Sequence, residues 1–466
     1  MSGMATSSTR PSRRRSDGRT CHWARRWARE VTTVAPPKRP LLERLPRWLA
    51  GPLGPLLEYR QLLLISIATV LVMAGQGVIS PVLPLFAAKF GVGSAAIGLT
   101  LSSFALARLI LNIPLGLLSD RYGRRLLLVS GPLVTGIGMV GSGFAVGIVD
   151  LLAWRFVAGA GSAMYMTGAQ IYLTDISNPT NRARFIGTNQ GALLLGVSVG
   201  PAVGGVLAEF WGLRAPFIVT GVAALFAMVH AYFKIPETRH LALAQIEAER
   251  KPLTPGAPAP VTPRREWLRF ATSRDFVAIS FVVMAIFLTR TAGKQTLMPL
   301  YAAEKLDMSP GVLGAVFTAM ALINVVLLAP AAVIADRYGR KWSIVPSSLV
   351  VAVSMFMLAS AGGYPMFLAG ALVHALGASL AGPAPAAYTA DIAPANLRGL
   401  AMGMFRTSGD VGFMIGPPLL GALADATSFG WGLAANGVIM AAACLWFLVI
   451  ARETIARPQD VVPARV

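Results

Sequence analysis

Long apolar stretches without a single charged side chain recur along this chain. Four of them lie between Arg60 and Lys89, between Arg125 and Asp150, between Arg214 and Lys234, and between Lys341 and Asp391. A helix that crosses a bilayer needs about 20 mostly apolar residues, so each stretch is long enough for at least one crossing. The last stretch is long enough for two crossings, with a turn at 362–365, where Gly and Pro residues cluster.

This pattern predicts an all-α membrane protein of twelve transmembrane helices in two parallel six-helix repeats. The first six helices are expected near 61–87, 94–118, 126–145, 151–173, 185–209 and 215–235. The second six are expected near 275–302, 310–334, 342–361, 366–390, 399–424 and 430–451. The composition agrees, because 55% of the residues are hydrophobic and only 13% are charged, against about 25% charged in soluble proteins.

The basic residues predict how the helices are oriented in the membrane. The chain carries 41 Lys and Arg residues against 21 Asp and Glu residues, for a formal net charge of +20. If both termini are cytosolic, only Lys89, Arg214 and Lys305 fall in predicted outer loops, which is the usual positive-inside bias of membrane proteins. The excess therefore indicates topology and attraction to anionic membrane lipid, and no nucleic-acid partner is expected.

Two segments outside the helices differ in composition. Residues 1–60 are rich in Arg, Ser, Thr and Pro and are expected to form a disordered cytosolic tail, with a transit peptide or a start-site artefact as the alternatives. Within the proline-containing linker, 241–250 favours either a short amphipathic surface helix or plain loop. The predicted domains are the tail 1–60, an N-terminal bundle 61–235, a cytosolic linker 236–272, a C-terminal bundle 273–452 and a cytosolic tail 453–466.

An internal repeat supports the division into two halves. At a constant offset of 216 residues, Gly98 falls on Gly314, and the string that begins at Asp120 falls on the string that begins at Asp336. Further matches are Asp175 with Asp391, Arg182 with Arg398, Gly200-Pro201 with Gly416-Pro417, and Glu237-Thr238 with Glu453-Thr454. Residues shared by both halves are expected to serve the frame and its gating, and ionisable residues in one half only are better candidates for chemistry.

Signals of other chemistry are weak. The two cysteines, Cys21 and Cys444, imply neither a disulfide framework nor a metal site. The sequence contains no glycine-rich phosphate loop and no nucleophile–base constellation. We therefore expect a protein that is not an enzyme and that uses no cofactor and no metal.

Three motifs resemble those of the major facilitator superfamily of transporters. The stretch 116–125 resembles motif A of the loop between helices 2 and 3, 155–161 on helix 4 resembles motif B, and 196–205 on helix 5 matches motif C. Motif C is typical of drug/proton antiporters, so the resemblance implies that branch. One departure is that helix 1 contains no acidic residue, since Glu58 precedes it, whereas such antiporters often carry one there. This argues against a cation-preferring multidrug site, and the cations of helix 7 suit anionic or zwitterionic cargo better.

Motif A and its repeat copy form the predicted gating loop, which in the family latches one transport state. Gly116 and Gly123 are expected to permit a sharp turn between helices 2 and 3. Asp120 is expected to pair with Arg124 or to cap a helix N-terminus, and the arginines are expected to face the cytosol and the lipid headgroups. The predicted gating residues are Gly116, Asp120, Arg121, Gly123, Arg124, Asp336, Arg337, Gly339 and Arg340.

Helix 5 carries a stripe of small residues. Gly196, Gly200 and Gly204 recur every fourth position and so share one helix face, which permits close approach of a neighbouring helix. Pro201 weakens the helix hydrogen bonding nearby. The pattern predicts a hinge at Gly196, Gly200, Pro201, Gly204 and Gly205, with tight packing alone as the alternative.

Ionisable residues inside spanning helices are costly and usually functional, and Asp410 is the leading example. It lies on helix 11, twelve residues beyond Arg398, or about 18 Å along a helix, near the middle of a roughly 30 Å hydrocarbon core. Its repeat counterpart is Leu194, so the acid belongs to one half only. We hypothesise that Asp410 carries a coupled proton; the alternative is a structural ion pair with Arg406, one turn earlier.

The remaining candidates are mostly cations. Arg290 and Lys294 lie one turn apart on helix 7, and both are predicted to line the substrate cleft. Arg290 is expected to face Asp410 across the cleft, and Lys294 to extend toward the outer surface. Arg155 is a proton-coupling candidate through the motif B resemblance, together with Arg406. Weaker cleft candidates, with interhelical hydrogen bonds as the alternative, are Gln76, Gln170, Gln190 and Asn324.

Together these features predict a secondary transporter, most simply a proton-coupled exporter of small organic compounds or drugs that works by alternating access. One alternative is proton-coupled uptake or facilitated transport of an organic anion or sugar-like solute, and a second is a receptor or scaffold that kept the fold without transport. The expected partners are a small-molecule substrate, protons and membrane lipid. We expect a monomer in the plasma or bacterial inner membrane, or in an organelle membrane if 1–60 is a transit peptide.

Overall fold

The computed structural model describes residues 59–177, 182–241, 264–394 and 397–454. Apart from Tyr59 and Arg60, these residues belong to one compact unit, Gln61–Val466. The described residues form helices and contain no strand. The predicted tail up to residue 58, the C-terminal tail from 455 and most of the linker, including the predicted helix at 241–250 beyond its first residue, lie outside the described residues.

The first set of helices matches the predicted order, with helix 1 in two pieces. A turn at Ser80 and Pro81 separates α3 from α4, because proline has no N–H to continue the helical hydrogen bonding. The helices are α3 (Arg60–Ile79), α4 (Val82–Ala88), α5 (Ser94–Tyr122), α6 (Arg124–Phe144), α7 (Ile148–Asp175), α8 (Arg182–Trp211) and α9 (Ala215–Lys234).

The second set repeats this order and adds a short helix. α11 (Arg264–Ala271) falls inside the segment predicted as linker. Trp267 and Phe270 are three residues apart and pack against the core of the second half, which explains why this part of the linker is helical. The others are α12 (Arg274–Leu288), η2 (Thr289–Leu297), α13 (Met298–Lys305), α14 (Pro310–Tyr338), α15 (Arg340–Ala359), α16 (Tyr364–Ala381), α17 (Ala384–Ile392), α18 (Arg398–Ala426) and α19 (Phe429–Ile450).

Ten stretches of helix in the described part of the chain are long and apolar enough to cross a membrane. The helices α7 and α18 complete the predicted set but are not among the ten. Both carry charged residues along their length, Arg155 on α7 and Arg406 and Asp410 on α18. The predicted fold class, an all-α membrane protein of two repeated halves, is confirmed, and the two helices outside the ten both carry candidate site residues.

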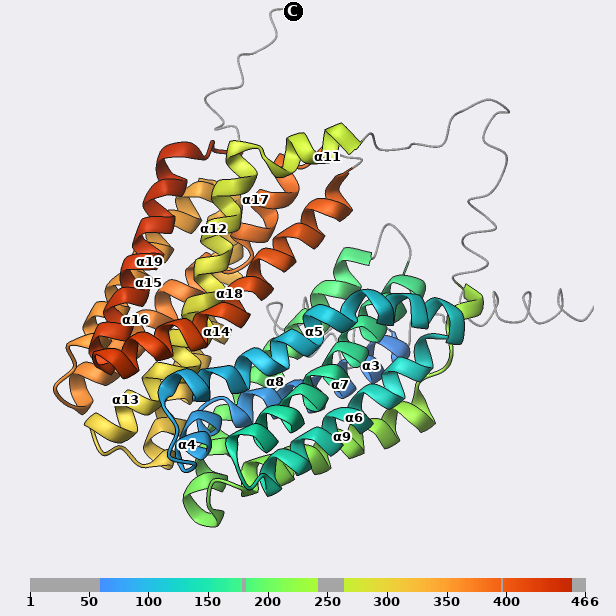
Figure 1. The fold of residues 1–466 in the computed structure, drawn as a ribbon. Coiled ribbons are helices and arrows are strands. Elements are labelled where there is room, and N and C mark those ends of the chain that lie inside the picture. The colour runs from blue at the N-terminus through green and yellow to red at the C-terminus, as the bar shows by residue number, and fades with distance from the viewer. Residues whose placement is uncertain (1–58, 178–181, 242–263, 395–396, 455–466) are drawn as a thin grey trace, which may run out of the picture. The chain divides into compact units, whose positions relative to one another are not determined.

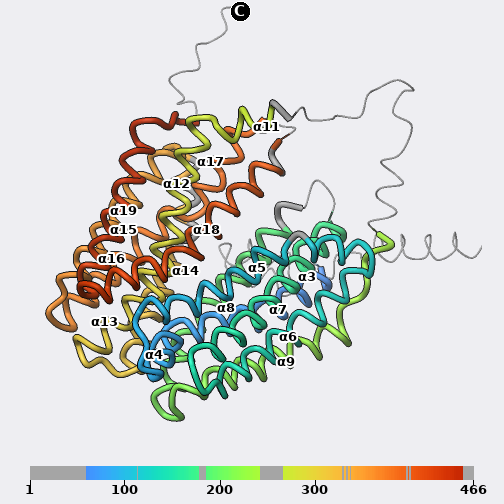
Figure 2. Tube along the Cα trace, viewed as in Figure 1, coloured from blue at the N-terminus to red at the C-terminus, as the bar shows by residue number. Residues whose placement is uncertain are grey.

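The two halves pack as separate bundles that meet along two helix pairs (Figures 1 and 2). In the first half α7 packs against α5 and α6, and in the second half α15 packs against α16 and α19. The halves meet where α5 contacts α18 and where α8 contacts α14. We call the helix ends near Ser94 and Asp425 the outer end and those near Gly123 and Gly339 the inner end, following the orientation predicted from the basic residues.

Candidate functional site

The charges at mid-depth come from both halves. Arg108 on α5 lies within electrostatic range of Asp410 and Arg406 on α18 and of Arg290 on η2. The predicted pairing of Arg290 with Asp410 across the cleft is wrong in one respect, because η2 and α18 belong to the same half. Arg108 faces Asp410 from the other half, although it is not among the predicted site residues.

Asp410 forms no ion pair shorter than 4.0 Å with any described residue, Arg406 included. The structural ion pair considered as the alternative is therefore absent from this conformation. Asp410 is partly buried, whereas Arg406 is exposed. The acid interacts with Arg108 at longer range.

Lys294 points into the second half rather than toward the outer surface, so the predicted extension to that surface is wrong. Its ammonium nitrogen lies 5.4 Å from the centroid of the Phe317 ring on α14. It is also within electrostatic range of His374 on α16 and of Arg290. His374 is buried, and its Nδ1 shares a 3.3 Å hydrogen bond with the Ser354 hydroxyl. This aromatic and histidine environment joins Lys294 to the bundle interior.

Arg155 is buried in the first half without an acidic partner among the described residues. Its guanidinium carbon lies 4.7 Å from the centroid of the Phe104 ring, and its Nη1 donates to the Met139 sulfur at 3.7 Å. Its Nε has no hydrogen-bond partner. A buried guanidinium held only by a ring face and a thioether is costly, and proton coupling through Arg155 stays a prediction.

Two of the four uncharged cleft candidates form interhelical hydrogen bonds. Gln76 on α3 donates to the Ser162 hydroxyl on α7 at 3.4 Å. Asn324 on α14 accepts from the Ser379 hydroxyl on α16 at 2.6 Å. Gln190 is exposed, and Gln170 is partly buried. The structure thus gives Gln76 and Asn324 a packing role and does not bring the four together.

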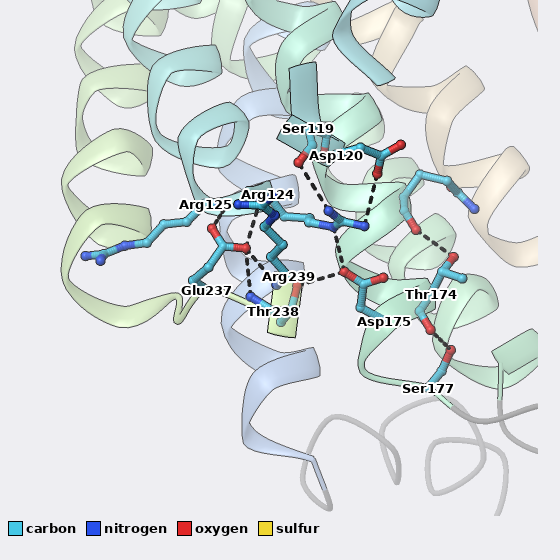
Figure 3. Close-up of polar contacts among 11 residues, drawn as sticks. Ser119, Asp120, Arg124, Arg125, Thr174, Asp175, Ser177, Glu237, Thr238 and Arg239 are labelled. Atoms are coloured by element: carbon cyan, nitrogen blue, oxygen red, sulfur yellow. Dashed lines mark hydrogen bonds and ion pairs between the residues drawn. The ribbon is translucent and has the colours of Figure 1, made fainter. Parts of the chain in front are cut away.

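A buried polar network occupies the inner end of the first half (Figure 3). Arg124 Nε donates to Asp175 Oδ2 at 2.8 Å, and both side chains are only 7% exposed. Arg124 also pairs with exposed Asp120 at 3.2 Å and donates to the Ser119 carbonyl. The Thr238 hydroxyl donates to the same Asp175 oxygen at 2.9 Å. The predicted Asp120–Arg124 pair is confirmed, but Arg124 does not face the headgroups as expected.

Glu237 completes this network at the N-terminus of α6. Its carboxylate accepts from the backbone N–H groups of Arg124 and Arg125, each at 3.0 Å, and from those of Thr238 and Arg239. Burial opposes ionisation of the carboxyl group, but these donors outweigh it and lower the pKa of Glu237. An ionised carboxylate is favoured where free N–H groups begin a helix, so Glu237 fixes the end of α9 to the start of α6.

The second half repeats the network in a more open form. Glu453 accepts from the backbone N–H groups of Arg340 and Lys341, and Arg340 Nε donates to Asp391 at 3.3 Å. Here Arg340 is 17% exposed and Asp391 37% exposed. The side chain of Asp336, the counterpart of Asp120, lies outside the described residues. The repeat match of Glu237-Thr238 with Glu453-Thr454 was the sequence signal of this network, although no role had been assigned to it.

The turn between the second and third helices of each half depends on a single glycine. Gly123 has φ +100° and Gly339 has φ +108°, a region that other residues rarely adopt. Gly116 lies within α5, so its predicted part in the turn is wrong. Arg121 and Arg337 are exposed beside Tyr122 and Tyr338.

The glycines of α8 pack on two different helices. The Cα positions of Gly196, Gly200 and Gly204 face the α3 backbone so closely that an added Cβ would collide with it. Gly205 instead meets Gly314 of α14, where a Cβ would lie 2.7 Å from the Gly314 Cα. Close packing of the predicted stripe is thus present, and Gly205 extends it to the contact between the halves. The hinge role stays a prediction.

Hydrogen bonds join the two halves at the outer end. The carboxylate of Asp425 accepts from the backbone N–H groups of Ser94 at 2.6 Å and Ala95 at 2.9 Å. Glu209 accepts from the Gly311 N–H at 2.9 Å. Each acid, from one half, caps the helix N-terminus of the other half, where negative charge is favoured. These contacts hold the outer end closed in this conformation.

An apolar cavity of about 510 Å³ lies between α5, α7 and α18. Its walls include Leu99, Leu106, Leu152, Met414 and Ile415. Met414 lies one helical turn from Asp410, so the cavity is adjacent to the mid-depth charges. Leu99, Leu106 and Ile415 are each about 40% exposed, so the cavity opens on the apolar outer surface of the helices.

Two helical halves that enclose ionisable groups at mid-depth define a polytopic membrane transport protein. The chain matches the profile of the Major Facilitator Superfamily over residues 65–293 and 288–463. It therefore belongs to that family, whose members bind and transport small molecules and are not enzymes.

Individual relatives agree with this assignment. An uncharacterised transporter of this family from Methanocaldococcus jannaschii is 26% identical over 366 residues, covering 78% of this chain and 92% of the relative. Quinolone resistance protein NorA of Staphylococcus aureus is 26% identical over 388 residues, covering 78% and 90%. The crystal structure of a bacterial homologue of the human lysosomal transporter Spinster has a TM-score of 0.67 at 15% identity, covering 84% and 96%. The last match concerns the fold alone.

Proposed function

We propose that this transporter exports small organic compounds in exchange for protons, by alternating access between its two halves. The observation that carries the proposal is Asp410, which is the one carboxylate at mid-depth among the described residues. Arg108 of the first half lies within electrostatic range of Asp410, and also within range of Arg406 and Arg290 of the second half. Protonation of Asp410 removes its attraction to Arg108, so proton binding changes an interaction between the halves that rock against each other.

Two further observations support export of organic compounds. The cavity of about 510 Å³ between α5, α7 and α18 has the size and apolar lining of a site for a drug-sized molecule. It opens on the surface that faces lipid, where apolar compounds dissolve. The NorA relative, named for quinolone resistance, covers most of this chain's length and favours an export role.

The test uses inverted membrane vesicles with an imposed pH gradient and a panel of organic compounds. A transported compound is expected to collapse the gradient, and Asp410→Asn is expected to abolish this collapse. Asp307→Asn is the matched control, because Asp307 is exposed in the loop between α13 and α14. Gradient collapse that survives in Asp410→Asn would show that the proton is carried elsewhere.

Uptake or facilitated transport of an organic anion is a second candidate, favoured by the cations Arg290 and Lys294. The two candidates differ in the direction of transport and can be separated by comparing vesicles of the two orientations. Accumulation of a labelled organic acid by right-side-out vesicles, driven by inward proton flow, supports uptake. Accumulation by inverted vesicles supports export.

We further propose that the inner end faces the cytosol of a cell with both termini on that side, and that the protein acts as a monomer. The basic residues around Gly123 and Gly339 support this orientation. Labelling of single cysteines introduced at Lys89 and at Arg121 tests it in intact cells. An impermeant maleimide is expected to react at position 89 and not at position 121.

A further inference from the structure

Carboxylates accept hydrogen bonds from backbone N–H groups at several helix N-termini, and they differ in whether the bond joins the two halves. Glu237 and Glu453 bind the starts of α6 and α15, each within its own half. Asp425 and Glu209 instead bind the starts of α5 and α14, each across the contact between the halves. Bonds within one half can persist through a transport cycle, whereas bonds between the halves must break whenever the outer end opens.

The two acids at the outer end occupy equivalent positions of the internal repeat, since Glu209 lies 216 residues before Asp425. The helix starts that they bind are equivalent as well, because 93–95 matches 309–311 at the same offset. One contact lies on the α5–α18 pair and the other on the α8–α14 pair, where the halves meet. The repeat thus builds the same contact twice, with the acid of each half directed at a helix of the other half.

The two contacts differ in strength because the helix starts differ. Two backbone N–H groups donate to Asp425 at the start of α5, at 2.6 and 2.9 Å. One of them belongs to Ser94, whose repeat counterpart is Pro310, and proline carries no N–H. Glu209 accordingly accepts from the Gly311 N–H at 2.9 Å without that second donor.

The helix α5 also lacks a cap of its own. Its N-cap residue is Gly93, which has no side chain that could accept from the first N–H groups of the helix. The helix α14 has Ser309 at this position, and the Ser309 hydroxyl accepts from the Val312 N–H at 3.4 Å. An added Cβ at Gly93 would lie 2.6 Å from Asp425 Oδ2, so the glycine leaves the room that the carboxylate of the other half occupies.

We propose that Asp425 controls the opening of the outer end by supplying, from the second half, the N-cap that α5 lacks, and that Glu209 is a weaker copy of this contact. Closing the outer end caps α5, and opening it removes the cap and returns the exposed carboxylate to water. The contact therefore stabilises the closed state selectively. This inference rests on alternating access, which is part of the proposed function, and is independent of proton coupling.

The test measures the distance between two spin labels by double electron–electron resonance on the full-length protein in detergent, with the native cysteines replaced by serine. The labels are placed at Lys89 and Lys305, exposed residues at the ends of α4 and α13 in opposite halves. Asp425→Ala is expected to shift the ratio of closed to open protein toward open by about fivefold or more, the effect of a lost N-cap. Glu209→Ala is expected to shift the ratio by about twofold, because one N–H group is lost and α14 keeps its own cap.

Three variants separate gating from simple damage. Gly93→Ser gives α5 a cap of its own while the new side chain meets the Asp425 carboxylate; it is expected to open the outer end as Asp425→Ala does and to melt no lower than that variant. Asp425→Asn keeps an oxygen acceptor and is expected to retain more of the closed state than Asp425→Ala. Asp150→Ala removes a carboxylate of α7 whose bond to the Val146 N–H, at 3.1 Å, stays inside the first half, and is expected to leave the distance unchanged.

An unchanged distance distribution in Asp425→Ala, or an equal shift in Asp150→Ala, overturns the inference. The vesicle assay keeps this result separate from the proposed function. Gradient collapse by the wild type, together with unchanged label distances in Asp425→Ala, leaves proton-coupled export standing and removes the role of Asp425. Opening of the outer end in Asp425→Ala, in a protein that exchanges no protons, leaves the role of Asp425 standing and removes the coupling mechanism.

Discussion

Replacing Asp175 by alanine is expected to destabilise the protein far more than the equivalent change in the second half. Asp175 accepts from Arg124 Nε at 2.8 Å with both side chains 7% exposed. Removing one member of a buried pair costs about 3–5 kcal/mol, because the other charge stays buried. Asp120 and the Ser119 carbonyl still contact Arg124, so the lower end of that range, about 3 kcal/mol, is expected for Asp175→Ala.

The internal repeat supplies a matched comparison. Asp391 occupies the equivalent position, but its contact with Arg340 is 3.3 Å long and Asp391 is 37% exposed. Water can replace a partner at such a site, so Asp391→Ala is expected to cost about 1 kcal/mol or less, as is Asp120→Ala at the exposed end of the first network.

The assay is thermal unfolding of each purified variant in one detergent, followed by intrinsic fluorescence. The expected order of loss in apparent melting temperature is Asp175→Ala well above Asp391→Ala and Asp120→Ala. Adding Arg124→Met to Asp175→Ala is expected to recover part of the loss, because the uncompensated charge is then gone. Equal losses for Asp175→Ala and Asp391→Ala would refute the argument that burial sets the strength of these pairs.

Two further predictions concern the ends of the bundles. The folded state lowers the pKa of Glu237 below its ordinary value of about 4.5. The ionised carboxylate therefore stabilises the folded protein above that value, and this stabilisation is lost as the pH falls through the lowered pKa. In thermal unfolding, Glu237→Gln is expected to melt at a lower temperature than the wild type near neutral pH and at about the same temperature in acid. Gly205→Val is expected to push α8 away from Gly314 of α14, which should lengthen the distance between spin labels at Lys89 and Lys305.

Each of these two predictions has its own control. Glu304→Gln removes an exposed carboxyl on α13 and is expected to leave the melting temperature unchanged at every pH. A Glu237→Gln difference that persists in acid would contradict the assigned cause. Gly191→Val alters the same helix at a place where an added side chain meets open space and should not change the label distance. An unchanged distance in Gly205→Val would mean that this contact does not hold the outer end closed.

The sequence by itself determined the class of fold, the number and order of the spanning helices and the repeat. These features are local or periodic: a spanning helix needs an unbroken apolar run, and a duplicated half repeats its residues at one offset. The same reasoning indicated Asp410, since a lone acid in an apolar run is conspicuous. It also predicted the Asp120–Arg124 pair, whose members lie four residues apart.

Only the tertiary structure decided which distant residues meet. Burial of Arg124 depends on Asp175 and Thr238, which lie 51 and 114 positions away in the chain, and no local pattern shows that contact. Arg108 faces Asp410 because α5 packs on α18, and Lys294 turns inward because Phe317 lies beneath its ammonium group. A side chain's partners are set by how helices pack, so the sequence identified the ionisable residues while packing decided which of them form the site.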